Sequence, residues 1–250
     1  MKTIYYSSFD DDFADNGIHT KPLSPDFSFQ KSGTRLFFES LFYRLVALPI
    51  VFCVAKLGYG LRVENKQAIR RLRGGFFLYC NHTASLDPFF TALAAFPSHA
   101  YTVCHPDAFS IGLDGLVSAV GGIPLPGNLR QTVAFRKLLL SLTAAGRAVV
   151  IFPEAHIWPR CPFIRPFPDT SFTYPVEAGL PVVTAVVTWR RGAITHRPKA
   201  TIRLLEPLYP DEKLSPREAR RDLRDRCYRQ MCDRVAQVDP PEFIHYEKKQ

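Results

Sequence analysis

The chain has 250 residues, of which 46% are hydrophobic and 13% aromatic, so it can bury one substantial hydrophobic core. Its formal net charge of +9 indicates an anionic partner, which nucleic acid, an anionic bilayer or a phosphate-bearing substrate would each provide. Nucleic acid is disfavoured, because the sequence has no zinc-finger spacing and no aromatic-basic RNA motif, and its basic residues do not form one stripe.

The cysteine pattern is typical of reduced core residues in an intracellular protein. The six cysteines contain no Cys-x-x-Cys pair, and several lie in apolar stretches: Cys53, Cys80, Cys104, Cys161, Cys227 and Cys232. This argues against a disulfide framework and against a structural zinc site. Cys104 beside His105, and Cys161 near His156, are scattered pairs of a kind that is usually incidental. We therefore expect no metal.

The N-terminal region divides into two parts. Residues 1–33 form a polar leader without the apolar core of a signal peptide, whereas residues 34–60 are rich in aromatic and aliphatic side chains. The longest uncharged run, residues 45–55, has 11 residues against the roughly 20 that a transmembrane helix needs. Two interpretations follow: a helical pair split near Pro49 that lies in a membrane interface, or a helical hairpin packed on the following domain.

Residues 61–250 show the alternation of strands and helices that is typical of an α/β domain. Apolar runs at 76–80, 148–152 and 182–187 each end at a polar or proline-containing turn, as buried strands do. Residues 132–145 carry apolar side chains at helical spacing and stop at a glycine. A capping box at Ser215 begins a final helix. We predict a single catalytic domain with a mixed, largely parallel sheet flanked by helices.

The first strand delivers a candidate for a positioned base. It ends at Asn81 and His82, and Asp87 follows five residues beyond the histidine. Active sites of α/β folds lie at the carboxyl ends of strands, so His82 would be a general base that Asp87 orients. Asp87 also has a structural interpretation as an N-cap, because Pro88 and an apolar helix face follow it. Taken alone, this pattern is more often structural than catalytic.

The segment NHTASLD at 81–87 resembles the Asn-His-x4-Asp block of the glycerolipid acyltransferase superfamily, in its 1-acyl-glycerol-3-phosphate acyltransferase-like form. Three further segments resemble the other blocks of that superfamily, in the same order: GGIPLPGN, IFPEAHIWPR and EAGLPVVTAVV. The resemblance covers about residues 60 to 190 and reverses the odds in favour of catalysis.

The departures from the blocks indicate a divergent branch. The usual second-block arginine is missing near Pro126, with Arg130 the nearest candidate. Ala155 and His156 replace the usual Gly-Thr, and Thr184 stands where a proline is common.

The resemblance implies transfer of an acyl group from a thioester to the free hydroxyl of a lysophospholipid. The expected acceptor is 1-acyl-glycerol-3-phosphate, which would give phosphatidic acid. His82 would take the hydroxyl proton during direct attack, so that Ser85 would be a turn residue rather than a nucleophile. The expected substrate-binding residues are Asn81, Glu154, Arg130, Arg160 and Arg165.

The same resemblance sets the expected partners. No resident cofactor is needed, because acyl-CoA or acyl carrier protein would be the acyl-donor substrate. The lysophospholipid, the thioester and a membrane surface would be the partners, and nucleic acid would not. An enzyme that acts on an insoluble lipid needs the bilayer surface, which favours the interfacial interpretation of residues 34–60. The protein would lie at the cytoplasmic face of a membrane, as a peripheral or monotopic protein.

Two alternatives from other classes remain. A thioesterase would use the same base with water as acceptor, although neither a Gly-x-Ser-x-Gly elbow nor a His-Glu-x-x-His motif occurs. A noncatalytic membrane-associated lipid-binding protein would keep the fold without turnover. The intact His82, Asp87 and Glu154 argue against such a loss.

Overall fold

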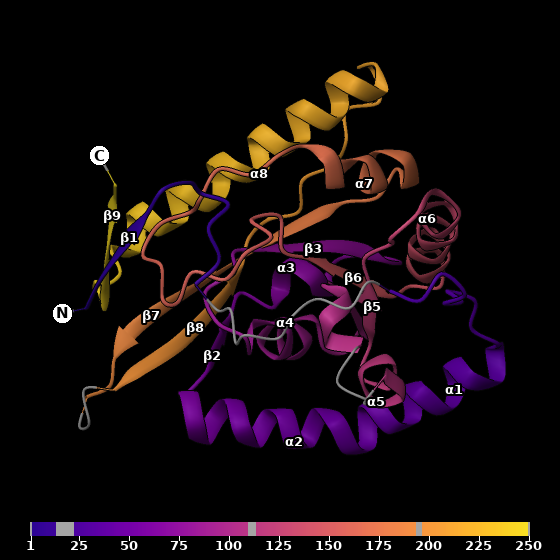
Figure 1. Cartoon of the computed structure of the whole chain (residues 1–250), viewed down its shortest axis with the longest axis horizontal. Coiled ribbons are helices and arrows are strands. Elements are labelled where there is room, and N and C mark those ends of the chain that lie inside the picture. Colours follow the sequence, from indigo (N-terminus) through magenta and orange to yellow (C-terminus); the bar gives the residue numbers. More distant parts are fainter. Residues whose placement is uncertain (1, 14–22, 110–113, 194–196, 250) are drawn as a thin grey trace.

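The protein is an α/β structure built on one mixed, largely parallel sheet (Figure 1). A computed structural model describes residues 2–13, 23–109, 114–193 and 197–249. The seven strands of the sheet follow the order β2-β8-β7-β3-β6-β4-β5. Five of them run parallel: β3 (Phe76–Cys80), β4 (Ala100–Cys104), β5 (Gly122–Pro124), β6 (Ala148–Ile151) and β7 (Val182–Arg191). The strand β8 (Pro198–Leu204) is antiparallel to β7 and parallel to β2 (Arg62–Glu64). The predicted fold class is therefore confirmed.

Helices cover both faces of the sheet, which explains why the central strand β3 is a continuous apolar run. Side chains alternate along it, so that Phe76 and Leu78 pack on one face while Phe77 and Tyr79 pack on the other. The first face is covered by the N-terminal helix, α3 (Gln67–Arg70) and α4 (Asp87–Ala95). The second is covered by α6 (Leu129–Ala144), α7 (Thr173–Ala178) and α8 (Pro216–Val238).

A single long helix occupies the N-terminal region, in place of the predicted helical pair. It runs from Gly33 to Gly58 over 26 residues and consists of α1 (Gly33–Phe42), a π-helical segment, α2 (Leu48–Cys53) and a second π-helical segment. The expected break at Pro49 does not occur. The wide turn before it, in which the Leu48 N–H donates to the carbonyl of Tyr43, makes room for the proline ring. The helix is long and apolar enough to cross a membrane, contrary to the estimate from its uncharged run.

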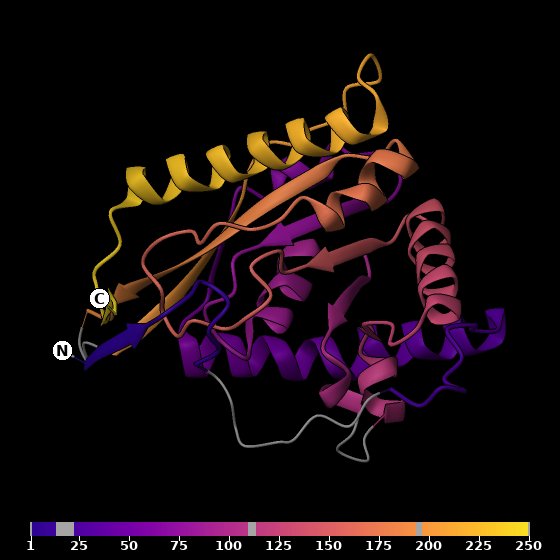
Figure 2. The same cartoon turned by 45° about the horizontal axis from the view of Figure 1, so that its top comes forward.

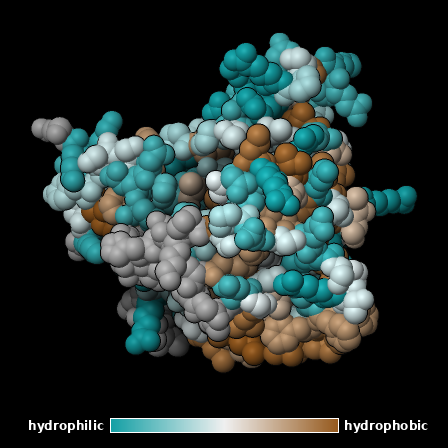
Figure 3. All heavy atoms as spheres, turned by 45° about the vertical axis from the view of Figure 1, so that its right-hand side comes forward, coloured by the Kyte–Doolittle hydropathy of each residue, from teal (hydrophilic) through white to brown (hydrophobic). Residues whose placement is uncertain are grey.

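Most of the apolar surface of this helix points away from the protein. Figure 3 shows apolar side chains gathered along the lower edge of the molecule, on the side where this helix lies in Figure 1. The exposed apolar residues on it are Phe37, Phe38, Leu41, Leu45, Val46, Ile50, Phe52, Val54 and Leu57.

The inner side of the helix is fixed to β4 through a buried histidine. The ring of His99 is stacked between Tyr43 of the helix and Tyr101 of β4, with centroid distances of 3.8 and 4.3 Å. Its Nδ1 lies 3.1 Å from the hydroxyl of Ser40. Burial lowers the pKa of His99 to about 3, so the imidazole in this contact is neutral at pH 7.

The two ends of the chain meet. The strand β1 (Lys2–Tyr6), in the expected polar leader, pairs in parallel with β9 (Ile244–Lys248). Figure 2 shows this two-stranded sheet near the carboxyl end of β7, apart from the main sheet. The remaining short helices are α5 (Asp114–Ala119) and two 3-10 turns, Pro106–Phe109 and Thr170–Phe172.

Candidate active site

Asn81 joins the end of β3 to β7 instead of facing a substrate. Its side-chain Oδ1 accepts the N–H of Val187 at 2.8 Å, and its Nδ2 donates to the Val187 carbonyl at 3.0 Å. Only 1% of Asn81 is exposed. Both hydrogen-bonding groups of the amide are thus used within the sheet. The structure departs here from the predicted substrate contact and makes Asn81 a residue that fixes the start of the next loop.

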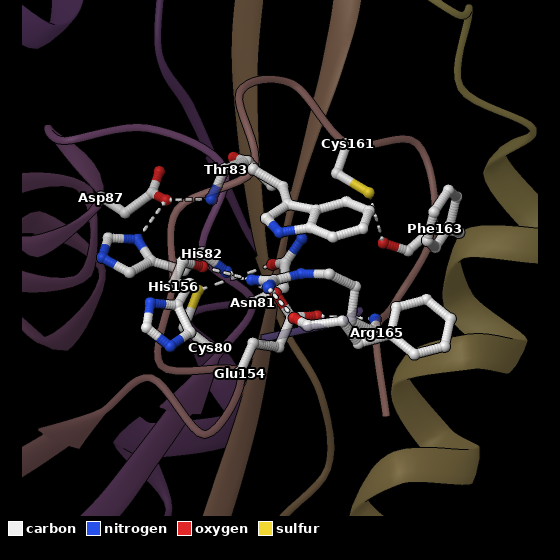
Figure 4. Close-up of polar contacts among 12 residues, drawn as sticks. Cys80, Asn81, His82, Thr83, Asp87, Glu154, His156, Cys161, Phe163 and Arg165 are labelled. Carbon is white, nitrogen blue, oxygen red and sulfur yellow. Dashed lines mark hydrogen bonds and ion pairs between the residues drawn. The ribbon is translucent and has the colours of Figure 1, made fainter. Parts of the chain in front are cut away.

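His82 and Asp87 form the pair that the sequence predicted (Figure 4). The Nδ1 of His82 lies 3.1 Å from Oδ2 of Asp87, and the side chain of Asp87 is fully buried. The same Oδ2 accepts the main-chain N–H groups of Thr83 and Ala84, at 2.5 and 2.8 Å. These donors precede α4, so the carboxylate closes the loop back onto His82 and is not an N-cap.

This geometry selects one tautomer of His82. A carboxylate that accepts from Nδ1 holds the ring proton there and leaves the lone pair of Nε2 available for a proton. The ring is not fully enclosed, since 12% of the side chain remains exposed. The ring also stacks on Phe152, directly after β6, with a centroid distance of 4.2 Å. The imidazole is therefore held by a hydrogen bond and by a stacked ring while part of its side chain stays exposed.

Glu154 is bound to the main chain of His82 and to Arg165. Its Oε2 accepts the His82 N–H at 3.0 Å, and its Oε1 accepts the Arg165 N–H at 2.8 Å. The Nη2 of Arg165 donates to Oε2 at 3.0 Å, and both side chains are 1% exposed. Burial raises the pKa of Glu154, an effect that the Arg165 guanidinium opposes. Both residues were predicted to bind substrate, but their charged groups face each other inside the protein.

The segment after Glu154 is attached to the loop that carries His82. The N–H of Trp158 donates to the His82 carbonyl at 3.1 Å, and the N–H of Arg160 donates to the Thr83 carbonyl at 2.9 Å. Ala155 and Arg160 adopt left-handed backbone conformations, with φ of 61° and 54°. Non-glycine residues rarely adopt this region, and strain of this kind is concentrated at functional sites. The sharp bends allow the segment to follow the loop that carries His82.

The two remaining predicted arginines differ in position. Arg160 is exposed, and its guanidinium carbon lies 5.8 Å from the ring centre of Trp189, whose Nε1 donates to Thr83 Oγ1 at 3.0 Å. Arg130 is exposed at the start of α6, directly after the edge strand β5. Three strand spacings of about 4.8 Å separate β5 from β3, so Arg130 begins on the order of 14 Å to the side of β3. Only Arg160 belongs to the surroundings of His82.

The N-terminal segment contacts the residues that follow Glu154, and the sequence did not predict these contacts. The indole of Trp158 is fully buried and donates to the Asp11 carbonyl at 2.7 Å. The Nη1 of Arg165 donates to the Phe9 carbonyl at 3.2 Å. Rings that pack around the indole come from both chain ends: Tyr6, Phe9, Phe13 and Tyr246. Main-chain acceptors and isolated aromatic residues in a polar segment have no recognisable spacing, so no sequence signal marks these contacts.

Neither a metal site nor a thiolate accompanies the histidine in the described part of the chain. No group of three or more His, Cys, Asp or Glu side chains among these residues could hold a metal ion. Cys80 precedes Asn81 in β3, and burial raises the pKa of its thiol well above the ordinary value. A protonated buried thiol is a poor nucleophile.

Comparison with known proteins places these residues in a family. The acyltransferase family model matches residues 60–188, slightly more than half of the chain. No curated protein matches the chain. The crystal structure of the 1-acyl-sn-glycerophosphate (LPA) acyltransferase PlsC from Thermotoga maritima is similar with a TM-score of 0.56 and 16% sequence identity. The similarity covers 84% of this chain and 98% of that one, so the two share a fold. The resemblance to the glycerolipid acyltransferase superfamily is thereby confirmed.

Proposed function

Because the chain belongs to the acyltransferase family, we propose that it transfers an acyl group from a thioester to the free hydroxyl of a lysophospholipid. The observation that carries the proposal is the Nδ1 to Oδ2 contact of 3.1 Å between His82 and the buried Asp87. The first acceptor to consider is 1-acyl-glycerol-3-phosphate, with phosphatidic acid as product. The structural relative named above acts on the same class of acceptor according to its name.

In the proposed reaction the neutral imidazole acts as a general base. The acceptor hydroxyl gives its proton to Nε2 of His82 while its oxygen bonds to the thioester carbonyl carbon. The carbon-sulfur bond then breaks, and the departing sulfur takes the proton from the imidazolium. Asp87 stabilises the imidazolium and keeps the ring oriented. General-base assistance of this kind contributes roughly 10²- to 10⁴-fold to the rate.

Arg160 is the residue proposed to bind the acceptor phosphate. It is the only one of the three predicted arginines that is both exposed and joined to the catalytic loop among the described residues. Its main-chain bond to Thr83 holds its Cα close to His82. A guanidinium offers a phosphate two parallel N–H donors, which would orient the glycerol toward the base. Glu154 and Arg165 would contribute indirectly, through the position of the His82 main chain.

The exposed apolar side of the helix Gly33–Gly58 supports a membrane location. The proposed lysophospholipid is insoluble, so an enzyme on the bilayer surface can take it directly from the lipid layer. We infer a peripheral or monotopic protein on the cytoplasmic face, with acyl-CoA or acyl carrier protein as the thioester donor.

The deciding experiment measures free thiol released from palmitoyl-CoA by the purified protein, with and without lysophosphatidic acid. The matched variant is His82→Ala, and the lipid product is identified by mass spectrometry. We expect acceptor-dependent formation of phosphatidic acid that the substitution abolishes. Thiol release without acceptor would instead identify a thioesterase. If the protein binds lysolipid but shows no turnover with either acyl-CoA or acyl carrier protein as donor, it is a noncatalytic lipid-binding protein.

A further inference from the structure

Three cations and two aromatic rings gather beside the C-terminal half of the long helix. Lys56 lies on the helix itself, whereas Lys66 and Arg70 lie at the two ends of α3. The Nζ of Lys56 is 6.0 Å from the ring centre of Phe52, and the Nζ of Lys66 is 5.6 Å from that of Phe96. We call Lys56, Lys66 and Arg70 the basic cluster. Its members come from elements that are separate in the sequence and that the fold brings together.

The basic cluster is not neutralised within the described residues. None of its three cations forms an ion pair with a described carboxylate, whereas other basic residues, such as Lys31 and Arg165, do. Burial, together with the positive charges of Arg70 and Lys56, lowers the pKa of Lys66. Lys66 and Arg70 are one helical turn apart, since the Arg70 N–H donates to the Lys66 carbonyl at 3.2 Å, and the repulsion acts between Lys66 and each of the other two cations. An external anion would relieve it.

The basic cluster borders the exposed apolar side of the helix. Phe52 and Phe96 are 51% and 48% exposed, and Leu57, next to Lys56, is 82% exposed. Arg44 of the helix donates to the Pro97 carbonyl at 3.2 Å, which holds the turn that carries Phe96 against the helix. Aromatic rings and long cationic side chains at the margin of an apolar surface are the arrangement found at the level of lipid headgroups. The apolar side and the basic cluster thus form one continuous surface.

We propose that the basic cluster binds the phosphate groups of an anionic bilayer while the exposed apolar side of the helix inserts among the acyl chains. This inference rests on the membrane location proposed above and does not depend on acyl transfer. The inference predicts that the bilayer must be anionic, a requirement that the apolar helix alone does not impose. The net charge of +9 also fits an anionic partner, but it is spread over the whole chain. The experiment must therefore test whether the position of the basic cluster matters, and not only the total charge.

The test compares two triple variants that lose the same charge. Lys56→Gln/Lys66→Gln/Arg70→Gln removes the basic cluster. Arg217→Gln/Arg221→Gln/Arg229→Gln removes three exposed arginines of α8, which lies on the opposite side of the sheet from the long helix (Figure 1). Binding is measured on vesicles of phosphatidylcholine alone and on equimolar phosphatidylcholine and phosphatidylglycerol. Thermal unfolding and binding to neutral vesicles show whether either variant is damaged.

A basic residue at an anionic membrane surface contributes roughly 5-fold in binding, so three contribute on the order of 100-fold. We expect the first variant to bind anionic vesicles about 100-fold more weakly than wild type and to bind neutral vesicles unchanged. The second variant should lose much less binding affinity for either kind of vesicle. Equal loss in both variants would mean that only total charge matters, and no loss in the first would mean that the basic cluster does not reach the bilayer.

Two further outcomes separate this inference from the proposed reaction. If wild type does not distinguish anionic from neutral vesicles, the basic cluster has no lipid role, whatever the transferase assay gives. If the first variant keeps full activity on detergent-dispersed substrates but loses it on anionic vesicles, headgroup binding and chemistry are separate steps. Loss of activity on dispersed substrates would contradict the assignment, because none of the three residues is proposed to touch substrate.

Discussion

Glu154 holds the main-chain N–H of His82 through Oε2, at 3.0 Å, although the two residues lie in different strand-to-loop turns. The same oxygen accepts from Arg165. A carboxylate that the sequence predicts as a substrate ligand thus connects the loop that carries His82 to a buried guanidinium. The position of the proposed base therefore depends on an ion pair that substrate never needs to touch.

Replacing Arg165 with Met should destabilise the protein by about 3–5 kcal/mol, because it leaves Glu154 buried without its counter-charge. Burial already raises the pKa of Glu154, and the variant should raise it further. An acid whose folded pKa is raised loses stability as pH increases through that range, so the deficit should be larger at pH 8 than at pH 5. Urea unfolding at both pH values measures this.

The matched controls for that variant are Arg229→Met, an exposed arginine, and the double variant Arg165→Met/Glu154→Gln. The first should stay within about 0.5 kcal/mol of wild type. The second should lose the pH dependence, since it has no carboxylate to ionise. A deficit that is equal at both pH values in the single variant would contradict the account.

Asp87→Asn should lower kcat by about 10²- to 10⁴-fold with little change in KM. An amide oxygen can still accept the N–H groups of Thr83 and Ala84, so the loop should remain folded. It carries no charge to stabilise the imidazolium. Initial rates with lysophosphatidic acid, alongside a thermal melt, test this. A kcat within tenfold of wild type would show that Asp87 is only structural.

Arg160→Gln should raise the KM for a phosphate-bearing lysolipid and leave the KM for the thioester unchanged. Arg130→Gln is the matched control, since it is also exposed but lies after the edge strand. A bidentate phosphate contact is typically lost at a cost of about 1.5–3 kcal/mol, which corresponds to roughly 10- to 150-fold in KM. If both variants behave alike, Arg160 does not bind the phosphate.

Acid should destabilise the attachment of the long helix through His99. Its pKa of about 3 lies below the ordinary value of 6.5, so the unfolded chain takes up a proton between these values while the folded chain does not. Stability is therefore fully present above pH 6.5 and falls as pH decreases. The loss at pH 5 should be about 2 kcal/mol.

The variant His99→Phe should remove that part of the pH dependence. Phe can keep the stack between Tyr43 and Tyr101. It loses the contact of Nδ1 with Ser40, which lowers stability at both pH values, but this loss does not depend on protonation of residue 99. Unfolding of both proteins at pH 7 and pH 5 gives the comparison. An unchanged pH dependence in the variant would mean that other groups cause it.

Ser85→Ala should retain most activity. Ser85 is exposed in the loop between His82 and α4, and direct attack by the acceptor hydroxyl requires no covalent acyl-enzyme. Rates and mass spectrometry of protein mixed with palmitoyl-CoA would settle the point. An acyl group on Ser85 would refute it.

Structural features that depend on neighbouring residues in the sequence were predictable. The roles of side chains whose partners lie far away in the sequence were not. The strands β3 (Phe76–Cys80) and β6 (Ala148–Ile151) follow from apolar runs, and the loop between His82 and Asp87 closes over five residues. Asn81 was assigned to substrate because its partner, Val187, lies in another strand. Arg165 was assigned to phosphate because nothing adjacent in the sequence reveals its burial against Glu154.

The long helix was misjudged for a different reason. The count of uncharged residues treats every charge as an interruption, and the predicted helical pair treated Pro49 as a break. Glu39 is instead buried and paired with Lys31 and Arg35, so it does not interrupt the helix. The wide turn before Pro49 likewise removes the conflict that proline usually causes. The pairing of Glu39 and the wide turn before Pro49 are features of the folded structure, so a count of residue types cannot predict them.

The pairing of β1 with β9 also bears on the order in which the parts of the protein can fold. The β9 residue Tyr246 donates to the Pro159 carbonyl at 2.8 Å and stacks on Trp158, next to the loop that holds His82. The main sheet contains no residue of β9, so it can form before β9 is in place. The contacts of Tyr246 beside the loop that holds His82 form only after β9 has paired with β1. A chain that lacks β9 would therefore keep the main sheet but lose the hydrogen bond and the stacked ring that Tyr246 gives to residues 158–159.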